Sequence, residues 1–423
     1  MKQDASWQPA GRRSRMWLRG LFAASAAALA VAIVAAGMPG TQAAAAAVTK
    51  HVMRGWGTNN DGELGHGTRS TLSDTPVTVV VPKGAIVTSV RAGCDHSVAL
   101  TSTGRVLAWG DNAEGQLGDG TTTSRDKPVY ARLPKHTKIK AVRAGCDDSI
   151  ALTTTGRVLT WGLGVEGALG NGSKLNRHTP VYVKLPKGVK VTAITAGCHH
   201  NLALTSSGRL LAWGLNLDGQ LGDGNTSNRD TPAYVKLPKG AKATSVAAGC
   251  QHSLAITSDG LFGWGRNTDG QLGNGTTTST DKPVRIIFLM RGRPLGRITG
   301  LFAGCQHTIA LFSHGAVLTW GGNAFGQLGN GTTTSSDKPV GVKLLAGVTV
   351  TAVSAGCYTS FALTRHGGIL AWGYDAEGQL GDGFTVSSDT PVPVKLPAGF
   401  GSIAIGAGPG AQHAFVIAPA KPG

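Results

Sequence analysis

Seven Trp-Gly pairs recur along this chain at a nearly constant interval. Successive pairs are 53, 52, 52, 51, 56 and 52 residues apart, and their tryptophans are Trp56, Trp109, Trp161, Trp213, Trp264, Trp320 and Trp372. A fixed period of a few tens of residues indicates one repeated supersecondary unit, each copy burying its apolar face against its neighbours. The period therefore constrains the fold strongly, whereas it says little about what the chain binds.

Each repeat reads as a group of short strands. In the third copy, residues 156–162 form an apolar run that ends in Trp-Gly, and a glycine-rich turn follows. Residues 179–186 are a β-branched run with a proline near each end, which an outer strand tolerates. Two further short runs, 191–195 and 201–204, alternate as strands do. The pattern predicts four antiparallel strands per repeat, and no amphipathic helical pattern of useful length follows residue 50.

The two ends of the repeated region complement each other. A glycine turn at 153–157 joins the last strand of one repeat to the Trp-Gly strand of the next, so these strands are expected to pair as a hairpin. The first Trp-Gly strand, 52–56, lacks such a partner upstream, and the last strand, 413–417, lacks one downstream. We therefore predict an all-β fold, a seven-bladed β-propeller of four-stranded antiparallel blades. Pairing of the N- and C-terminal strands closes it and removes exposed sheet edges.

The N-terminal region has the pattern of a secretory signal peptide. Four arginines between residues 12 and 19 precede an apolar stretch over 21–36, and an alanine-rich region follows. We expect a secreted protein, extracellular or associated with the cell wall, that meets the membrane only transiently through this signal. The alternative is that the apolar stretch remains as an anchor, although a bilayer span needs about twenty apolar residues.

These features divide the chain into three parts. We predict a signal peptide over 1–45, with an approximate cleavage point, a short linker over 46–50, and the propeller over 51–423. The repeats of the propeller are expected at about 51–103, 104–155, 156–207, 208–258, 259–313, 314–366 and 367–418.

The repeated motifs carry a family resemblance. They run in the order Trp-Gly, Gly-Gln-Leu-Gly, Asp-Lys/Thr-Pro-Val and Ala-Gly-Cys-x-His-Ser-x-Ala-Leu-Thr. This pattern resembles the regulator-of-chromosome-condensation repeat over roughly residues 51–417, and the resemblance implies a seven-bladed propeller. Members of that family include a nuclear guanine-nucleotide exchange factor, a plant ultraviolet photoreceptor and many proteins that bind other proteins. With its predicted signal peptide, the chain is identified as an exported, bacterial-type member.

Six cysteines occupy one column of the repeat, and alanine replaces them in the seventh copy. An even number of cysteines in an exported chain usually predicts disulfides. Equivalent positions in neighbouring blades are expected about 7–9 Å apart, however, which is too far for a disulfide. We therefore predict buried free thiols and no metal site at Cys94, Cys146, Cys198, Cys250, Cys305 and Cys357.

Five histidines recur two residues after the cysteine column, at His96, His200, His252, His307 and, after Ala411, His413. A ring of histidines could bind a metal, but copies one blade apart are not expected to share an ion. We expect each histidine to hydrogen bond to the backbone instead. No cofactor and no catalytic group of residues is predicted, because an active site requires different groups that converge on one point.

The charge of the chain is strongly basic, with 40 Lys and Arg against 23 Asp and Glu and a formal net charge of +17. Many bases fall in the loop that follows each Pro-Val strand, and the corresponding segments 345–347 and 397–399 have none. We call these residues the basic arc: Lys83, Lys135, Lys138, Lys187, Lys190, Lys239, Lys242, Arg291, Arg293 and Arg297. Equivalent loops emerge on one face, so the basic arc is the predicted binding site for an anionic partner. Ordinary solvated surface charge is the alternative.

The sequence thus predicts an exported, monomeric, non-enzymatic interaction scaffold. Its partner would be a protein or an anionic cell-surface polymer, with no specific nucleic acid, bound through loops on a propeller face. Two alternatives come from other functional classes. One is guanine-nucleotide exchange, which the family resemblance alone implies, and the other is a propeller enzyme that acts on wall polysaccharide.

Overall fold

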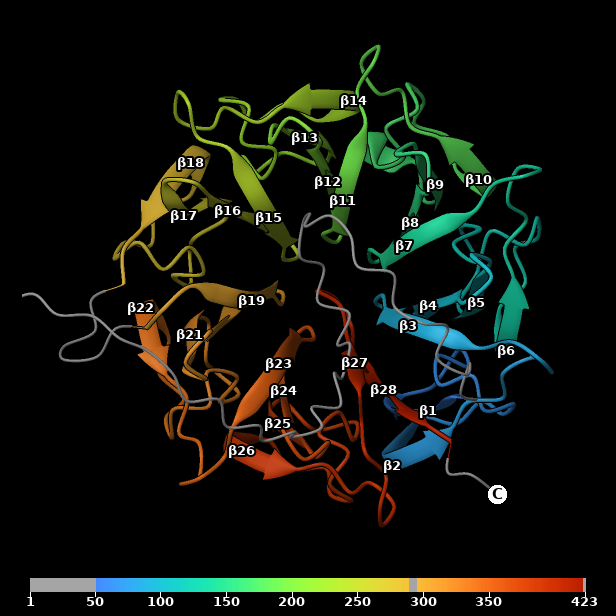
Figure 1. Ribbon diagram of the computed structural model, residues 1–423, viewed down its shortest axis with the longest axis vertical. Helices are drawn as coiled ribbons and strands as arrows, with labels where there is room; N and C mark the ends of the chain where they lie inside the picture. Colours follow the sequence, from blue (N-terminus) through green and yellow to red (C-terminus); the bar gives the residue numbers. More distant parts are fainter. Residues whose placement is uncertain (1–50, 289–294, 421–423) are drawn as a thin grey trace, which may run out of the picture. The chain divides into compact units, whose positions relative to one another are not determined.

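The computed structural model describes residues 51–288 and 295–420, whose strands form seven four-stranded antiparallel sheets around a common centre (Figure 1). Within these ranges the single helical element is a 3-10 turn, η1 (Val165–Gly167). The prediction of an all-β, seven-bladed propeller is therefore confirmed. Among the same residues, no helix has the length and apolar character needed to cross a membrane. The predicted signal peptide (1–45) and linker (46–50) lie outside the described residues.

Six sheets each take four consecutive strands, ordered from the centre of the ring outward (Figure 1). Their bounds are β3 (Val87–Ala92), β4 (His96–Thr101), β5 (Val106–Gly110) and β6 (Arg125–Tyr130); β7 (Ile139–Ala144), β8 (Asp148–Thr153), β9 (Val158–Gly162) and β10 (Arg177–Tyr182); β11 (Val191–Ala196), β12 (His200–Thr205), β13 (Leu210–Gly214) and β14 (Arg229–Tyr234); β15 (Ala243–Ala248), β16 (His252–Thr257), β17 (Gly260–Gly265) and β18 (Thr280–Ile286); β19 (Ile298–Ala303), β20 (His307–Phe312), β21 (Val317–Gly321) and β22 (Ser336–Gly341); β23 (Val350–Ala355), β24 (Thr359–Thr364), β25 (Ile369–Gly373) and β26 (Ser388–Pro393).

The seventh sheet is built from both ends of the propeller. Its order from the outside inward is β2 (Leu72–Thr78), β1 (His51–Thr58), β28 (His413–Pro419) and β27 (Ala404–Gly406). Strands β1 and β28 pair antiparallel in register from His51 opposite Pro419 to Gly57 opposite His413. The predicted closure by the terminal strands is confirmed, and the backbone groups of β1 are satisfied on both sides.

The repeated motifs meet between blades. Trp161 is fully buried, and its Nε1 donates a hydrogen bond of 2.8 Å to the carbonyl oxygen of Gln116 in the preceding repeat. Gly118 of the same Gly-Gln-Leu-Gly segment has φ +68°, and a Cβ there would lie 2.7 Å from the Trp161 ring. The glycine is required by both its backbone conformation and this close approach. The Trp-Gly and Gly-Gln-Leu-Gly motifs are therefore two halves of one contact that joins successive blades.

The buried histidines also join neighbouring blades through side-chain hydroxyls that the sequence did not suggest, and the expected backbone hydrogen bond acts on His96 and His307. The Nε2 atom of each lies 2.7–3.1 Å from a hydroxyl on the adjacent blade, in the pairs His96–Ser149, His200–Ser253, His252–Thr308, His307–Ser360 and His413–Ser97. Burial lowers the pKa of His252 and of His413 to about 3, so these rings are neutral at physiological pH. These histidines recur in the sequence because each makes the same contact between neighbouring blades.

Candidate functional site

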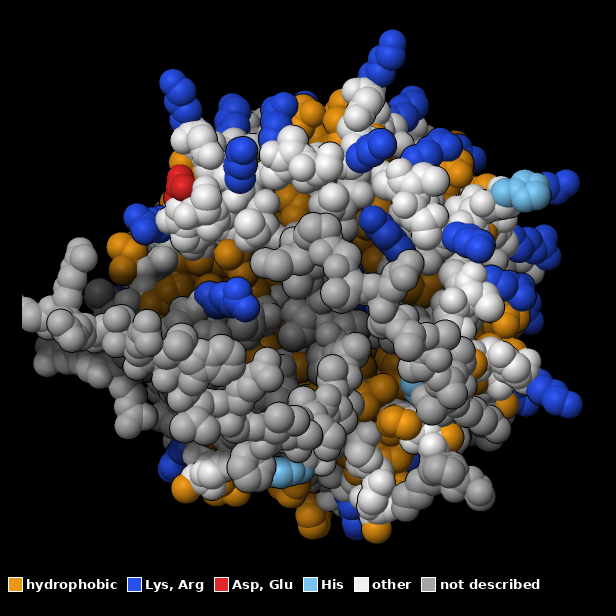
Figure 2. Space-filling model, viewed as in Figure 1, with side chains coloured by type: hydrophobic (Ala, Val, Ile, Leu, Met, Phe, Trp, Pro, Cys, Tyr) orange, Lys and Arg blue, Asp and Glu red, His pale blue; other side chains and the backbone are white. Residues whose placement is uncertain are grey.

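The loops of the propeller emerge at two opposite faces, because adjacent strands in every blade run antiparallel. One face carries the hairpins between the second and third strands, and the connections from each fourth strand to the next blade. We call it the hairpin face, and it is the face seen in Figures 1 and 2. The other carries the loops between first and second strands and between third and fourth strands. Since the cysteines lie in the former loops, we call it the cysteine face.

The basic arc lies on the hairpin face. Its described members are exposed, and they occupy the connections β2–β3 (Lys83), β6–β7 (Lys135, Lys138), β10–β11 (Lys187, Lys190), β14–β15 (Lys239, Lys242) and β18–β19 (Arg297). Arg291 and Arg293 lie outside the described residues. Lysine and arginine side chains follow the rim of this face over β6, β10, β14 and β18 (Figure 2). The structure thus brings equivalent loops to one face, as the repeat predicts.

Backbone hydrogen bonds fix one residue of the basic arc in each of four consecutive blades. The carbonyl oxygens of Lys138, Lys190 and Lys242 each accept a 2.9 Å hydrogen bond from the hairpin of their own blade. Arg297 accepts the equivalent bond at 2.8 Å. The four side chains are exposed while their backbones are held at matching positions. The spacing of these positive charges is therefore set by the propeller rather than by free loops.

Three arginines that the sequence analysis overlooked reinforce this face. The guanidinium carbons of Arg105, Arg157 and Arg209 lie 3.3–3.4 Å from the ring centroids of Tyr130, Tyr182 and Tyr234. Each pair joins a Gly-Arg hairpin to the end of the outer strand in the same blade. A signal for it exists in the sequence, because the repeats with Gly-Arg are also those with tyrosine at that strand end. Stacking on the ring restrains the guanidinium and leaves its N–H groups free to bind an anion.

Acidic residues are distributed in the opposite way. In the described loops of the hairpin face the single acidic residue is Asp259. The cysteine-face loops contain Asp61, Glu63, Asp95, Asp111, Glu114, Asp119, Asp147, Glu166, Asp218, Asp223, Asp269, Asp375, Glu377 and Asp382. Desolvation raises the pKa of Asp95 to about 6, with further increases from Asp147 and Asp61. The carboxylates around Asp95 are therefore crowded, and the two faces carry opposite charge.

The cysteines at the centre of the cysteine face correct a prediction. Disulfides join Cys94 to Cys146 and Cys250 to Cys305, with Cα–Cα distances of 4.5 and 4.4 Å, so four of the six thiols are paired. The loops converge at the end of the inner strands and hydrogen bond directly to one another. Cys146 N donates to the carbonyl oxygen of Cys198, for example, at 3.0 Å. The predicted separation of 7–9 Å was wrong. It holds for equivalent residues within the inner strands of neighbouring blades, whereas the cysteines lie in loops beyond the strand ends, where neighbouring loops hydrogen bond to one another.

Two arginines also occupy the inner strands. Arg91 on β3 and Arg143 on β7 each precede a cysteine by three residues. Each Nη1 donates to a carbonyl oxygen of its own strand, at 2.7 and 2.8 Å, and within the described ranges neither forms an ion pair. Burial and the charge of Arg91 lower the pKa of Arg143 to about 9. The sequence did not predict this pair, because the two arginines are far apart along the chain and come close only when β3 and β7 are placed side by side.

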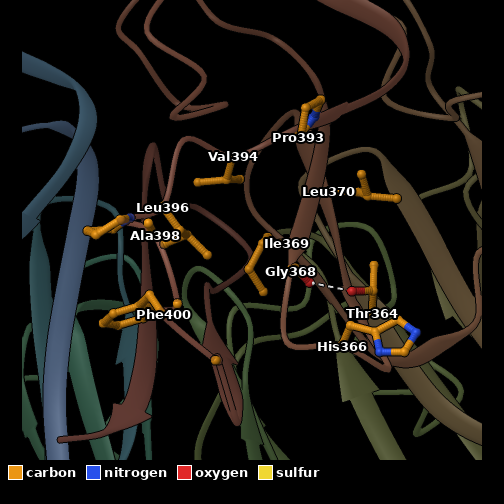
Figure 3. Close-up of a pocket in the computed structure, with 13 residues that line it drawn as sticks. Thr364, His366, Gly368, Ile369, Leu370, Pro393, Val394, Leu396, Ala398 and Phe400 are labelled. Atoms are coloured by element: carbon orange, nitrogen blue, oxygen red, sulfur yellow. Dashed lines mark hydrogen bonds between the residues drawn. The ribbon is translucent and has the colours of Figure 1, made fainter. Parts of the chain in front are cut away.

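A pocket of about 580 Å³ lies beside the β24–β25 hairpin and the β26–β27 connection, on the hairpin face. Figure 3 shows that Ile369, Val394, Leu396 and Phe400 give it a largely apolar lining. The hydrogen bond drawn there runs from Thr364 Oγ1 to the carbonyl oxygen of Gly368 at 3.1 Å. Convergent charged groups of the kind that catalysis needs are missing from this lining. The pocket is suited to burying an apolar side chain of a partner.

Comparison with known sequences identifies relatives of the whole propeller. A profile of the RCC1-like domain matches residues 23–309, and profiles of the regulator of chromosome condensation (RCC1) repeat match 298–327, 314–363 and 366–417. The chain is 34% identical over 310 residues to the ultraviolet-B receptor UVR8 of Arabidopsis thaliana, covering 73% of this chain and 70% of that receptor. It is 33% identical over 313 residues to the human E3 ubiquitin-protein ligase HERC2, of which it spans 6%.

Solved structures show the same fold. The structure of human WBSCR16 superposes with a TM-score of 0.78 and 23% identity, covering 88% of this chain and 100% of that one. Prp20p from Saccharomyces cerevisiae gives a TM-score of 0.76 and 24% identity, covering 88% and 92%. All these relatives are eukaryotic, so the expectation of a bacterial-type member finds no support among them.

Proposed function

The chain belongs to the regulator of chromosome condensation (RCC1) repeat family, and we propose that it is a non-enzymatic scaffold that binds an anionic partner through its hairpin face. The partner would be an acidic protein or an anionic polymer of the cell surface. Relatives carry this fold in proteins as different as a light receptor and a ubiquitin ligase. The family therefore does not select a partner, and the proposal depends on the surface of this chain.

The segregation of charge between the two faces is the observation that supports it. The described hairpin-face loops hold the described members of the basic arc and one acidic residue, whereas the cysteine-face loops hold most of the acids. Charge that served only solubility would not need to be sorted in this way. The basic arc also stops within the ring, because Ala346 and Ala398 stand where Lys187 stands in its own repeat. This loop position is thus basic in one part of the ring and uncharged in another, as a surface that binds an anion would require.

The apolar pocket extends the same face beyond the end of the basic arc. It lies between β25 and the β26–β27 connection, in the part of the ring where the lysine is replaced by Ala398. A protein that lay across the lysines could insert an apolar side chain beside Leu396 and Phe400 (Figure 3). This combination of charged and apolar contacts favours an acidic protein over a featureless polyanion as the tighter ligand.

The proposal includes export. The arginines before the apolar stretch and the alanine-rich segment after it support a cleaved signal over 1–45. The partner would then be met outside the cytosol. Fractionation of cells that produce the full chain should recover a shortened protein in the medium or wall, and N-terminal sequencing should place its first residue near 46. Full-length protein confined to the cytosol would contradict export, but it would leave the proposed binding through the hairpin face unaffected.

A matched pair of variants tests the binding surface. The first changes Lys135, Lys187 and Lys239 to glutamate, all within the basic arc. The control changes Lys127, Lys282 and Lys338 to glutamate, which are exposed on outer strands and carry the same total charge change. Binding is measured on immobilised poly-glutamate and on anionic wall polymer. The first variant should lose at least tenfold in affinity and the control little. Equal losses would show that net charge alone is responsible, and no loss would overturn the proposal.

A further inference from the structure

Six sulfur atoms come together at the centre of the cysteine face. The Sγ atoms of Cys94, Cys146 and Cys198 lie within 4.8 Å of one another, and so do those of Cys198, Cys250 and Cys305. Cys357 completes the ring, with its Sγ 2.6 Å from that of Cys305. The seventh repeat supplies no sulfur and fills the centre with backbone. Cys250 and Cys305 Sγ each lie 3.1 Å from the carbonyl oxygen of Pro409 in that repeat.

We propose that, once its two disulfides are reduced, this cysteine ring binds a soft d10 metal ion, either Cu(I) or Zn²⁺. Thiolate sulfur is the ligand that both ions prefer. An ion held at about 2.3 Å from each sulfur requires sulfur atoms about 4 Å apart. In each three-cysteine group two sulfurs are bonded to each other and the third lies within 4.8 Å of both, so reduction frees the bonded pair to move apart to the spacing that an ion requires. Cysteines one blade apart can share an ion here because their loops meet at the tips of the inner strands, where Cys146 N hydrogen bonds to Cys198 O.

The redox state of the ring decides whether the site exists. A dithiol reductant delivers two electrons and two protons to each disulfide and leaves two thiols, so reduction of both bonds yields six thiols. Cys198 is already unpaired and belongs to both three-cysteine groups. Metal binding then releases the thiol protons.

The surroundings of the ring favour entry of a cation. Asp95 and Asp147 follow Cys94 and Cys146 directly, and Asp61 and Asp111 lie in further loops of the same face. These carboxylates form an acidic mouth on the same face as the sulfur atoms. Cys94 is partly exposed, which gives an ion in this mouth access to the first sulfur. Although the chain as a whole is basic, a cation would therefore reach the sulfur atoms through the acidic cysteine face.

Metal titration of the reduced, full propeller tests the proposal. Protein reduced with a dithiol and desalted anaerobically is incubated with Cu(I) or with Zn²⁺, and the metal that remains after gel filtration is measured. The reduced protein should retain at least one ion per chain of one of these metals. The air-oxidised protein, which has the two disulfides, should retain none. Retention of Cu(I) alone or of Zn²⁺ alone both support the proposal and identify the ion. A reduced, folded chain that retains neither would overturn it.

Two variants locate the bound ion. Cys198→Ser removes the ligand common to both groups and should lower metal affinity at least tenfold. Ala411→Ser introduces the same hydroxyl at the position of this column that supplies no sulfur, and as the matched control it should keep at least one ion. If Cys198→Ser unfolds, wild-type protein still decides the question, because metal should raise the melting temperature of the reduced chain and not of the oxidised one. Equal binding by both variants would place the ion elsewhere and contradict the site.

Discussion

Asn201 Nδ2 donates a 2.9 Å hydrogen bond to Asp148 Oδ2 across two neighbouring blades, and both side chains are buried. At the equivalent contact in five other places around the ring, a histidine meets a hydroxyl, as in His96 and Ser149. The contact between the blades β7–β10 and β11–β14 therefore departs from the histidine–hydroxyl pattern at both partners together. Two changes that look unrelated in the sequence are complementary in the structure, since each preserves a buried polar contact at the same point of the ring.

This relationship predicts coupling between the two positions. Asp148→His alone would set an imidazole against the Asn201 amide, and Asn201→Ser alone would leave Asp148 without its hydrogen bond. Each single variant should lose about 1–3 kcal/mol, because a buried polar group loses its partner. The double variant rebuilds the histidine–serine pair of the other blades and should recover at least half of the combined loss. Urea unfolding of all four proteins measures this, and strictly additive losses would show that the pair is not coupled.

Burial also makes Asp148 a source of pH dependence. Desolvation raises the pKa of Asp148 to about 8 from its ordinary value of 3.8, so the folded chain binds this proton more tightly than the unfolded chain. The carboxyl is therefore neutral in the fold at low pH, and its contribution to stability is lost as pH rises from about 4 to about 8. Asp148→Asn removes this titration. Its melting temperature relative to wild type should increase across that interval, and a constant difference would contradict the raised pKa.

The sequence predicted those features that depend on the repeat alone. The period gave seven blades, and the unpaired strands at 52–56 and 413–417 gave the closure that β1 and β28 display. The exposed positions of Lys135 and Lys187 on one face followed from equivalent loops in equivalent blades. These inferences succeed because symmetry carries them from one copy to all the others.

What the sequence did not predict depends on distances between copies. The cysteine loops meet at the axis through bonds such as Cys146 N to Cys198 O, which no spacing along the chain reveals. The crowding of carboxylates near Asp95 was hidden for a similar reason. Asp95 and Asp111 lie in two different loops that reach the same face only after folding. The pairing of Arg157 with Tyr182 was within reach, since both residue types change together from repeat to repeat.

Closure of the ring by the terminal strands has a direct consequence for truncation. Deleting residues 402–423 removes β27 and β28 and leaves β1 with a partner on one side only. The remaining chain should lose cooperative unfolding or aggregate, because an open propeller exposes a sheet edge and the apolar side of two blades. Deleting residues 1–47 instead should leave the melting temperature unchanged. A C-terminal truncation that melts like the full propeller would show that the closing blade is dispensable.

The arginine–tyrosine pairs should affect binding more than folding. Tyr182→Ala removes the ring under Arg157 and frees a guanidinium whose carbon lies 3.4 Å from the ring centroid. We expect a loss of about 0.5–1 kcal/mol in stability and a weaker interaction with poly-glutamate, because the freed side chain must be ordered again on binding. Tyr182→Phe keeps the ring and is the control, with affinity close to wild type. If the two variants bind equally, the ring does not orient Arg157 for binding.

The opposite charges of the two faces predict that binding depends on salt but not on the far carboxylates. Inner and outer strands of about six residues separate the faces by about 20 Å, which is more than twice the Debye length of about 8 Å at physiological ionic strength. The double variant Asp95→Asn with Asp147→Asn, which neutralises two carboxylates on the cysteine face, should therefore leave affinity for poly-glutamate unchanged within about twofold.

Changing Lys187 and Lys239 to alanine should lower affinity and reduce the slope of log K against log salt by about one for each base. Titrations at several salt concentrations check both expectations. An equal response to the two pairs of substitutions would mean that the polyanion responds to net charge, and that the hairpin face is not its binding site.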